Sequence, residues 1–185
     1  PWTMCASASS IIHWNAIPVF ADIEKNTFCI DPNSVEHLIT KKTKAILSVD
    51  IFGQSAAQMK LKKIAKKYKL KLISDTAQSP GSLYNKKFSG TLSDIGGFSL
   101  NHHKHIHTGE GGVLFTNNKK LAHKMQLLRN HAEAVMDTND PKELNNMVGH
   151  NYRMGEIEAA IGIEQIKKLK KIIVKRQKLA KLLSK

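Results

Sequence analysis

The sequence predicts an α/β fold in which helices flank a mostly parallel sheet. The first observation behind this prediction is an alternation along the chain, because short apolar segments typical of buried strands are followed by segments with helical periodicity. The second is a length of 185 residues with 41% hydrophobic residues, which is enough to bury one core. Strands that alternate with helices pair in parallel, since each helix returns the chain across a face of the sheet.

Three strands are predicted in the first half of the chain, each next to a predicted helix. These strands span residues 17–23, 44–49 and 70–74. A helix over residues 6–14 precedes the first strand, and another begins at Asp31-Pro32, where an N-cap carboxylate is followed by a proline in the first turn. Ser55 and Gln58 form a capping-box pattern, which predicts the start of a third helix.

The second half of the chain continues the alternation and ends in a long helix. Two further strands are predicted over residues 97–100 and 113–116. An apolar stripe predicts a helix through residues 121–128, and residues 133–150 show no period and predict an irregular loop. One helix is expected from Met154 to the end of the chain. We therefore divide the chain into a sheet domain, residues 1–153, and a long final helix, residues 154–185.

The chain is strongly basic, with a formal net charge of +14, and this charge invites a nucleic-acid interpretation. The composition weakens that interpretation, because 26 basic residues are lysines and three are arginines, whereas readers of bases and phosphates favour the arginine fork. Many lysines fall in residues 60–71 and 167–185, beside apolar residues at helical spacing, which is typical of solvated helix faces. We expect no nucleic-acid partner. The alternative is a basic nucleic-acid-binding or regulatory protein, which a steep loss of DNA binding with added salt would support.

The sequence has no feature of a membrane or secretory protein. No apolar run is long enough to span a bilayer, and no signal segment opens the chain. Cys5 and Cys29 are too few for a disulfide scaffold, so we expect a cytoplasmic protein with no membrane partner. The chain begins with Pro1 and stops at Lys185 inside a helical pattern that has no stop signal, so we expect a piece of a longer protein.

Two residues follow predicted strands where an α/β sheet places its chemistry. Asp75 comes directly after strand 70–74, so its carboxylate is expected in the crevice at the carboxyl end of the sheet, although an aspartate there could also cap the next turn. Lys104 follows strand 97–100 and stands between imidazoles. A lysine in a partly desolvated pocket can lose its proton and form a Schiff base with an aldehyde, whereas most lysines are surface charges.

A histidine tract and a glycine-rich turn surround Lys104. The tract consists of His102, His103, His105 and His107. We expect no metal site there, because no cysteine or carboxylate pair has a familiar metal spacing and adjacent histidines diverge on a helix or a strand. The turn at residues 109–112 lacks the lysine of a P-loop and the spacing of a dinucleotide-binding loop, so a tight turn with positive φ is predicted.

Several short motifs follow one another in order over about the first 165 residues. They are PWTM at 1–4, PVFADI at 18–23, TFCIDP at 27–32, Asp75 with Gln78, Ser99 five residues before Lys104, GEGG at 109–112, and NYRMGEIEAAIG at 151–162. By their order and spacing the chain resembles the DegT/DnrJ/StrS family of aminotransferases, which depend on pyridoxal 5'-phosphate (PLP) and act on keto-sugar nucleotides. The resemblance implies the large PLP-binding domain of a fold-type-I aminotransferase, incomplete here.

The resemblance implies a role for each matching residue. Lys104 would hold PLP covalently and then move the proton during catalysis. Asp75 would pair with the pyridine nitrogen and keep it protonated, Gln78 would lie near the phenolic oxygen, and Ser99 would bind the cofactor phosphate. Asn151 is by itself a good N-cap for the last helix. In the family pattern it would reach the cofactor phosphate of a partner subunit, which implies a homodimer with shared active sites.

The first residues of the chain match the family less closely. Thr3 and Met4 would contact the cofactor, and Met4 stands where relatives often carry an aromatic residue or a histidine over the ring. The resemblance also implies that residues 1–153 are part of the large domain and that the helix 154–185 leads to the small C-terminal domain of the family. That small domain and the upstream phosphate contact have no counterpart in these residues. We therefore expect this chain alone to be inactive.

The reaction that the resemblance implies is transamination. Glutamate or a similar donor would give its amino group to a keto-sugar nucleotide, and the product would be an amino sugar for a polysaccharide or another glycoconjugate. Some relatives instead dehydrate a sugar, and in them a histidine replaces the lysine. The spacing from Ser99 to Lys104 keeps a lysine at that position, which favours amino transfer over dehydration.

Overall fold

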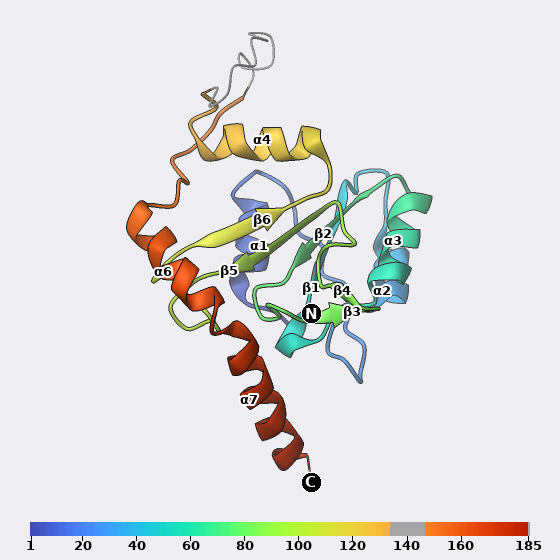
Figure 1. The fold of residues 1–185 in the computed structure, drawn as a ribbon. Helices are drawn as coiled ribbons and strands as arrows, with labels where there is room; N and C mark the ends of the chain where they lie inside the picture. Colours follow the sequence, from blue (N-terminus) through green and yellow to red (C-terminus); the bar gives the residue numbers. More distant parts are fainter. Residues whose placement is uncertain (134–146, 185) are drawn as a thin grey trace.

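The central sheet of the molecule confirms the predicted fold class. A computed structural model describes residues 1–133 and 147–184, and Figure 1 shows how they are arranged. The main sheet has the order β1-β2-β5-β6, with β1 at Ala45–Val49, β2 at Lys71–Asp75, β5 at Ile95–Ser99 and β6 at Gly112–Phe115. β1, β2 and β5 are mutually parallel, and β6 runs antiparallel to β5. The fold is therefore α/β with a mostly parallel sheet.

Helices and one small hairpin connect these strands. The helices are α1 (Cys5–Ile12), α2 (Pro32–Leu38), α3 (Gln58–Lys67), α4 (Lys119–Arg129), α6 (Glu156–Ile166) and α7 (Leu169–Leu183). A short 3-10 turn, η1 (Ile51–Gly53), follows β1, and a hairpin of β3 (Leu83–Tyr84) and β4 (Lys87–Phe88) lies between β2 and β5 in the chain. No helix among the described residues is both long and apolar enough to cross a membrane.

Side chains of β1 and β2 alternate between the two faces of the sheet, as strand geometry requires. Ile46 of β1 and Leu72 of β2 are buried in one apolar cluster with Leu61 of α3. Asp75 at the end of β2 points to the opposite face, where Ser7 of α1 donates a hydrogen bond to it. Helices α1 and α3 therefore cover opposite faces, and the carboxylate of Asp75 lies on the α1 face.

The structure confirms one predicted helix start and contradicts another. The Asp31 carboxylate caps α2 by accepting a hydrogen bond from the backbone N–H of Asn33 at 2.9 Å. The prediction of a capping box formed by Ser55 and Gln58 is wrong, because α3 begins after Ala57 with no side-chain cap. Gln58 is fully buried instead, since serines of β1 and β2 provide hydrogen-bond partners for its amide. A long-range contact therefore replaces the local one.

The strand predicted at residues 17–23 does not form. This segment makes one isolated antiparallel bridge, between Ile23 and Ile30, and joins neither sheet of the described chain. Its apolar residues favour a buried strand, but a strand also needs a neighbour that pairs with its backbone groups. Residues 16–21 and β1 line a shared pocket in place of such a pairing.

The C-terminal helical region differs from the single helix predicted from Met154. It begins after Gly155, which is the N-cap of α6, and residues 167–168 separate α6 from α7. α7 packs against the turn after β2, where a Cβ atom on Gly81 would lie 2.5 Å from Cδ1 of Ile173. The turn approaches α7 this closely because Gly81, with φ of 84°, has no side chain.

Two predictions about the second half of the chain are not tested by this structure. Most of the irregular loop expected at residues 133–150 lies outside the described residues, since residues 134–146 are not among them. The division into a sheet domain, residues 1–153, and a connecting helix, residues 154–185, remains a prediction.

Candidate functional site

Asp75 lies at the carboxyl end of the parallel strands, as the sequence predicts. It is the last residue of β2, and in the β2–β5 pairing it stands opposite Gly97. Its Oδ2 accepts a hydrogen bond from Ser7 Oγ at 2.8 Å, and its Oδ1 accepts one from the backbone N–H of Ala77 at 3.0 Å. The hydrogen bond from Ala77 is the one expected if Asp75 caps the turn after β2. The hydrogen bond from Ser7 comes from a different part of the chain and is not explained by turn capping. Both oxygens keep lone pairs for a further donor.

Ser7 is a residue of this site that sequence reasoning missed. Its side chain is buried in α1, and its Oγ is 2.8 Å from Oγ1 of Thr3, a predicted cofactor contact. Thr3 therefore reaches Asp75 through one intervening hydroxyl. The spacing of Thr3 and Ser7, four residues apart at the start of a helix, could have indicated their mutual contact. The bond from Ser7 to Asp75 joins residues 68 positions apart, and no local pattern predicts it.

Gln78 links the turn after β2 to the turn after β1. Its Oε1 accepts a hydrogen bond from the backbone N–H of Phe52 at 3.2 Å. Phe52 is in η1 and has a left-handed backbone with φ of 52°, which an L-residue rarely adopts. Met4 is the N-cap residue of α1, and its side chain is 54% exposed. It therefore belongs to the same N-terminal segment as Thr3 and is open to a ligand.

Ser99 and Lys104 belong to the end of β5 and the turn that follows it. Ser99 Oγ accepts a hydrogen bond from the backbone N–H of Asn101 at 3.1 Å, and the backbone N–H of Lys104 donates to the carbonyl of Asn101 at 3.0 Å. The Lys104 side chain is half-buried. Gly109 further along has φ of 87°, which confirms the predicted turn with positive φ.

The histidines beside Lys104 have different surroundings from one another. His102 is exposed, and its Nδ1 lies 3.9 Å from the Glu110 carboxylate. Burial lowers the pKa of His105, and the positive charges of Arg176 and Lys104 lower it further. Within residues 1–133 and 147–184, no group of three histidine, cysteine or acidic side chains is placed to hold one metal ion.

Asn151 does not cap the last helix, so the simpler interpretation of this residue is wrong. It is exposed and forms an isolated antiparallel bridge with Asn130, at the end of α4. The backbone N–H of Tyr152 adds a hydrogen bond to the carbonyl of Arg129 at 2.9 Å. This pairing, and not helix capping, fixes the position of Asn151.

A second aspartate, Asp50, directly follows β1 and is fully buried. Its carboxylate accepts hydrogen bonds from the backbone N–H of Ala56 at 2.7 Å, from Ser89 Oγ at 2.7 Å and from Gln58 Nε2 at 3.4 Å. Burial raises the pKa of Asp50, although these donors oppose the rise. Sequence reasoning did not single out this residue, and its surroundings are those of a structural polar network.

The structure brings some of the predicted site residues together and leaves others apart. Thr3 and Asp75 are joined through Ser7, whereas among the described residues no hydrogen bond joins Lys104, Met4 or Asn151 to Asp75. The turns after β2 and β5 carry Gln78 and Lys104. The carboxyl edge of the sheet therefore combines a carboxylate that can stabilise a protonated nitrogen with an amine that can bind a carbonyl carbon.

Comparison with known proteins gives one family for the whole chain. The model of the DegT/DnrJ/EryC1/StrS aminotransferase family matches residues 1–185. The chain is 39% identical over 176 residues to the GDP-perosamine synthase of Caulobacter vibrioides, and the match covers 95% of this chain and 46% of that protein. The chain thus spans about half the length of the curated relatives that it matches.

Solved structures give the same result. Helicobacter pylori PseC, an aminotransferase involved in the biosynthesis of pseudoaminic acid, matches with a TM-score of 0.82 and 36% identity over 90% of this chain and 44% of its own. GDP-4-keto-6-deoxy-D-mannose-3-dehydratase of E. coli, solved with bound hydrated PLP, matches with a TM-score of 0.74 and 33% identity over 88% of this chain and 45% of its own.

Proposed function

The chain belongs to the DegT/DnrJ/EryC1/StrS aminotransferase family, whose enzymes depend on PLP, and from this premise we propose that it carries the cofactor-binding half of a sugar-nucleotide aminotransferase. The enzyme would move an amino group from glutamate or a similar donor to a keto-sugar nucleotide. The similarity to a GDP-perosamine synthase and to a GDP-4-keto-6-deoxy-D-mannose-3-dehydratase supports this substrate class, and the similarity to PseC supports the transfer of an amino group. The product would be an amino sugar for a polysaccharide or another glycoconjugate.

The main observation behind this proposal is the carboxylate of Asp75 at the end of β2, which two hydrogen bonds fix in place. The turn that contains Lys104 follows the neighbouring strand β5. These residues fit PLP. Both carboxylate oxygens of Asp75 can accept a further hydrogen bond, which a protonated ring nitrogen would donate. The amine of Lys104 is the type of nucleophile that bonds to an aldehyde.

The catalytic roles divide between Asp75 and Lys104. When bound, PLP supplies an electron sink for the carbanion at the carbon that exchanges its amino group. Asp75 would hold the proton on the ring nitrogen, and the donors Ser7 and Ala77 would fix the orientation of its carboxylate. Lys104 would hold the cofactor through Nζ and would later accept and return the substrate proton at the same atom.

The remaining predicted residues would bind and orient the cofactor. Because Oε1 of Gln78 faces a backbone N–H of η1, its Nε2 is the end that can donate to the phenolic oxygen. The hydroxyl of Ser99 would donate to the phosphate, and Thr3 and Met4 would lie along the ring. Asn151 is exposed and carries amide donors, so we propose that it contacts the phosphate of the cofactor in a second copy within a homodimer.

Sugar dehydration is the second candidate function, because the chain is 33% identical to a dehydratase of E. coli. The same PLP site would serve, with a histidine as the base in place of a lysine. His103 and His105 stand on either side of Lys104, so a shift of one position would exchange the two functions. The spacing from Ser99 to Lys104 supports the aminotransferase.

An amino-transfer assay with a matched lysine variant tests the proposal. The full-length protein expressed from its gene is incubated with PLP, glutamate and a GDP- or UDP-linked 4-keto-6-deoxyhexose, and the release of 2-oxoglutarate is measured. We expect Lys104→Ala to abolish release, since it removes the amine, and Lys87→Ala, which changes an exposed lysine of the β3–β4 hairpin, to leave it unchanged. Turnover that survives Lys104→Ala, or sugar dehydration without transfer of an amino group, would contradict the proposal.

A further inference from the structure

The rings of four residues from two distant parts of the chain pack together beside the C-terminal end of α1. His13 is the C-cap residue of α1 and Trp14 follows it, whereas His150 and Tyr152 stand on either side of Asn151. The His150 ring stacks on Tyr152 with the ring centroids 5.0 Å apart and the planes 14° from parallel, and it meets Trp14 edge to face at 5.3 Å. His13 contacts Trp14 at 5.4 Å and His150 at 6.3 Å, and we call these four rings the aromatic cluster.

The end of α4 holds the backbone of residues 150–152 in an extended form. The backbone N–H groups of residues 150 and 152 donate to the carbonyls of Leu128 and Arg129 at 2.8 Å and 2.9 Å, and the bridge from Asn151 to Asn130 lies between these two bonds. Successive side chains of an extended segment point to opposite sides. The rings of residues 150 and 152 therefore lie on the side of the aromatic cluster, and Asn151 lies on the opposite side, where it is exposed.

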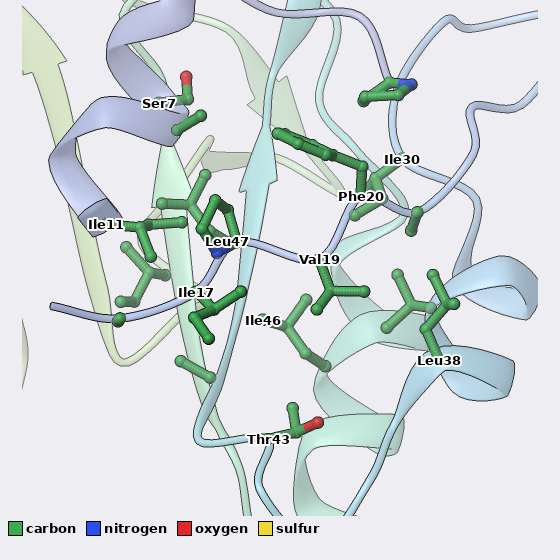
Figure 2. A pocket seen from close by; sticks show the side chains of 18 of the residues that line it. Ser7, Ile11, Ile17, Val19, Phe20, Ile30, Leu38, Thr43, Ile46 and Leu47 are labelled. Atoms are coloured by element: carbon green, nitrogen blue, oxygen red, sulfur yellow. The ribbon is translucent and has the colours of Figure 1, made fainter.

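Helix α1 connects the aromatic cluster to the carboxylate of Asp75. Ser7 in the first turn of α1 donates to Asp75, and the aromatic cluster begins at the last turn. Ser7 and Ile11 both line the pocket beside β1, so this face of α1 is directed toward the sheet (Figure 2). The helix has eight residues and is about 12 Å long. One short helix thus lies between Asp75 and the segment that contains Asn151.

We propose that Trp14 and His150 are positioning residues for Asn151. This inference rests on the proposed function, in which Asn151 contacts the phosphate of the cofactor in a second copy. A hydrogen bond from the Asn151 amide depends on the direction of its N–H group, and the backbone of residues 150–152 sets that direction. The end of α4 holds this backbone through hydrogen bonds, and Trp14 holds it through the ring of His150.

The exposure of the aromatic cluster argues against a role in the core of the fold. Trp14 is 54% exposed and Tyr152 is 60% exposed, so each ring keeps more than half of its surface in contact with solvent. The apolar core of the described chain contains none of the four rings. Removal of one ring should therefore leave the fold intact and change the segment on which the cluster packs.

Titration with two forms of the cofactor tests the proposal. The full-length protein expressed from its gene is titrated with PLP and with pyridoxal, which has the same aldehyde and no phosphate, and the absorbance of the adduct with lysine gives each Kd. We expect Trp14→Ala to raise the Kd of PLP about 10-fold or more, because a hydrogen bond to a charged group is weakened, and to leave the Kd of pyridoxal within about twofold. Trp14→Phe keeps a ring and should retain the affinity for PLP. Phe88→Ala removes a 63% exposed ring of β4 and should change neither Kd.

Asn151→Ala shows whether Trp14 acts through Asn151. This variant should also lose affinity for PLP and not for pyridoxal, and adding Trp14→Ala to it should cost less than about twofold more, because both changes remove one contact. An equal loss for PLP and pyridoxal in Trp14→Ala, an additive loss in the double variant, or an unchanged Kd of PLP in Asn151→Ala would overturn this inference alone. A parent protein that forms no adduct with PLP would overturn the proposed function and this inference with it.

A pair of substitutions at His150 gives a second readout that does not require a change at Trp14. His150→Phe keeps a ring between Trp14 and Tyr152 and should bind PLP like the parent. His150→Ala removes the centre of the aromatic cluster and should raise the Kd of PLP about as much as Trp14→Ala does, with the Kd of pyridoxal unchanged. The same Kd of PLP in both variants would contradict a role for the ring.

Discussion

Asp50 and Asp75 occupy equivalent positions relative to their strands, but their side chains have different surroundings. Each aspartate comes at the end of a parallel strand, after β1 in one case and as the last residue of β2 in the other, and the backbone N–H of Asp50 donates to the carbonyl of Asp75 at 2.9 Å. Asp50 is fully buried among three donors. Asp75 is half-buried with two donors.

The difference follows from what each side chain meets beyond its strand. Asp50 meets the start of α3 and Ser89, which use its acceptor capacity inside the protein. Asp75 meets one hydroxyl of α1 and one turn N–H, so it can accept a further donor from a ligand. We infer that Asp50 stabilises the fold and that Asp75 serves the cofactor, and the following three experiments test this contrast.

The largest expected effect is that of Asp75→Asn on catalysis. If Asp75 holds the proton of the ring nitrogen, the variant should lose several orders of magnitude in turnover, about 3–5 kcal/mol of barrier lowering, and should keep its fold. Steady-state kinetics and circular dichroism measure the two properties. Near-normal turnover together with a lower Tm would instead assign Asp75 to turn capping alone.

Asp50→Ala should lower the stability of the protein and leave its turnover nearly unchanged, which is the reverse of Asp75→Asn. The change leaves the N–H of Ala56 and the hydroxyl of Ser89 without their acceptor, so we expect a loss of about 2–4 kcal/mol in the free energy of unfolding. Turnover per folded molecule should remain within about threefold of the parent. Urea unfolding measures the change in the free energy of unfolding. A loss of turnover as large as that of Asp75→Asn would contradict the different roles assigned to the two residues.

The smallest effect concerns the pH dependence of stability. Because burial raises the pKa of Asp50 in the folded state, the folded protein binds more protons than the unfolded chain between the two pKa values. The contribution of Asp50 is therefore fully present below its unfolded pKa and is lost as pH rises through its folded pKa. Asp50→Asn removes this titration.

The unfolding free energy of the parent should thus fall relative to that of Asp50→Asn as pH rises through the folded pKa of Asp50. Titration of His105 and of the other groups is common to both proteins, so the difference between the two curves isolates Asp50. Parallel curves across acid and neutral pH would show that the carboxyl group of Asp50 titrates in the folded protein as it does in the unfolded chain.

The parts of the fold that local patterns control could be predicted from the sequence. The strands expected at 44–49 and 70–74 appear as β1 and β2, displaced by at most one residue at either end, and the Asp31 cap forms as expected. The turn at Gly109 has the predicted positive φ. Each of these features depends on residues only a few positions apart, such as an apolar run, a capping carboxylate or a glycine.

The parts that sequence reasoning missed depend on distant partners. Gln58 fits a capping box, but the buried hydroxyls of β1 and β2 bind its amide. Ser7 joins the candidate site through a partner 68 positions away. Residues 17–23 have a strand sequence without a strand beside them in the described chain. Such features can be identified only once the fold shows which distant residues lie next to each other.

Covalent attachment of PLP to Lys104 is the step on which the proposed chemistry depends. PLP is added to the protein made from its own gene, borohydride fixes the cofactor to the amine that holds it, and peptide mass mapping then locates the label among the 26 lysines. We predict a single labelled peptide that contains Lys104, and no label in the same peptide of Lys104→Ala. A label on another lysine, or one spread over many surface lysines, would contradict the assignment of this site.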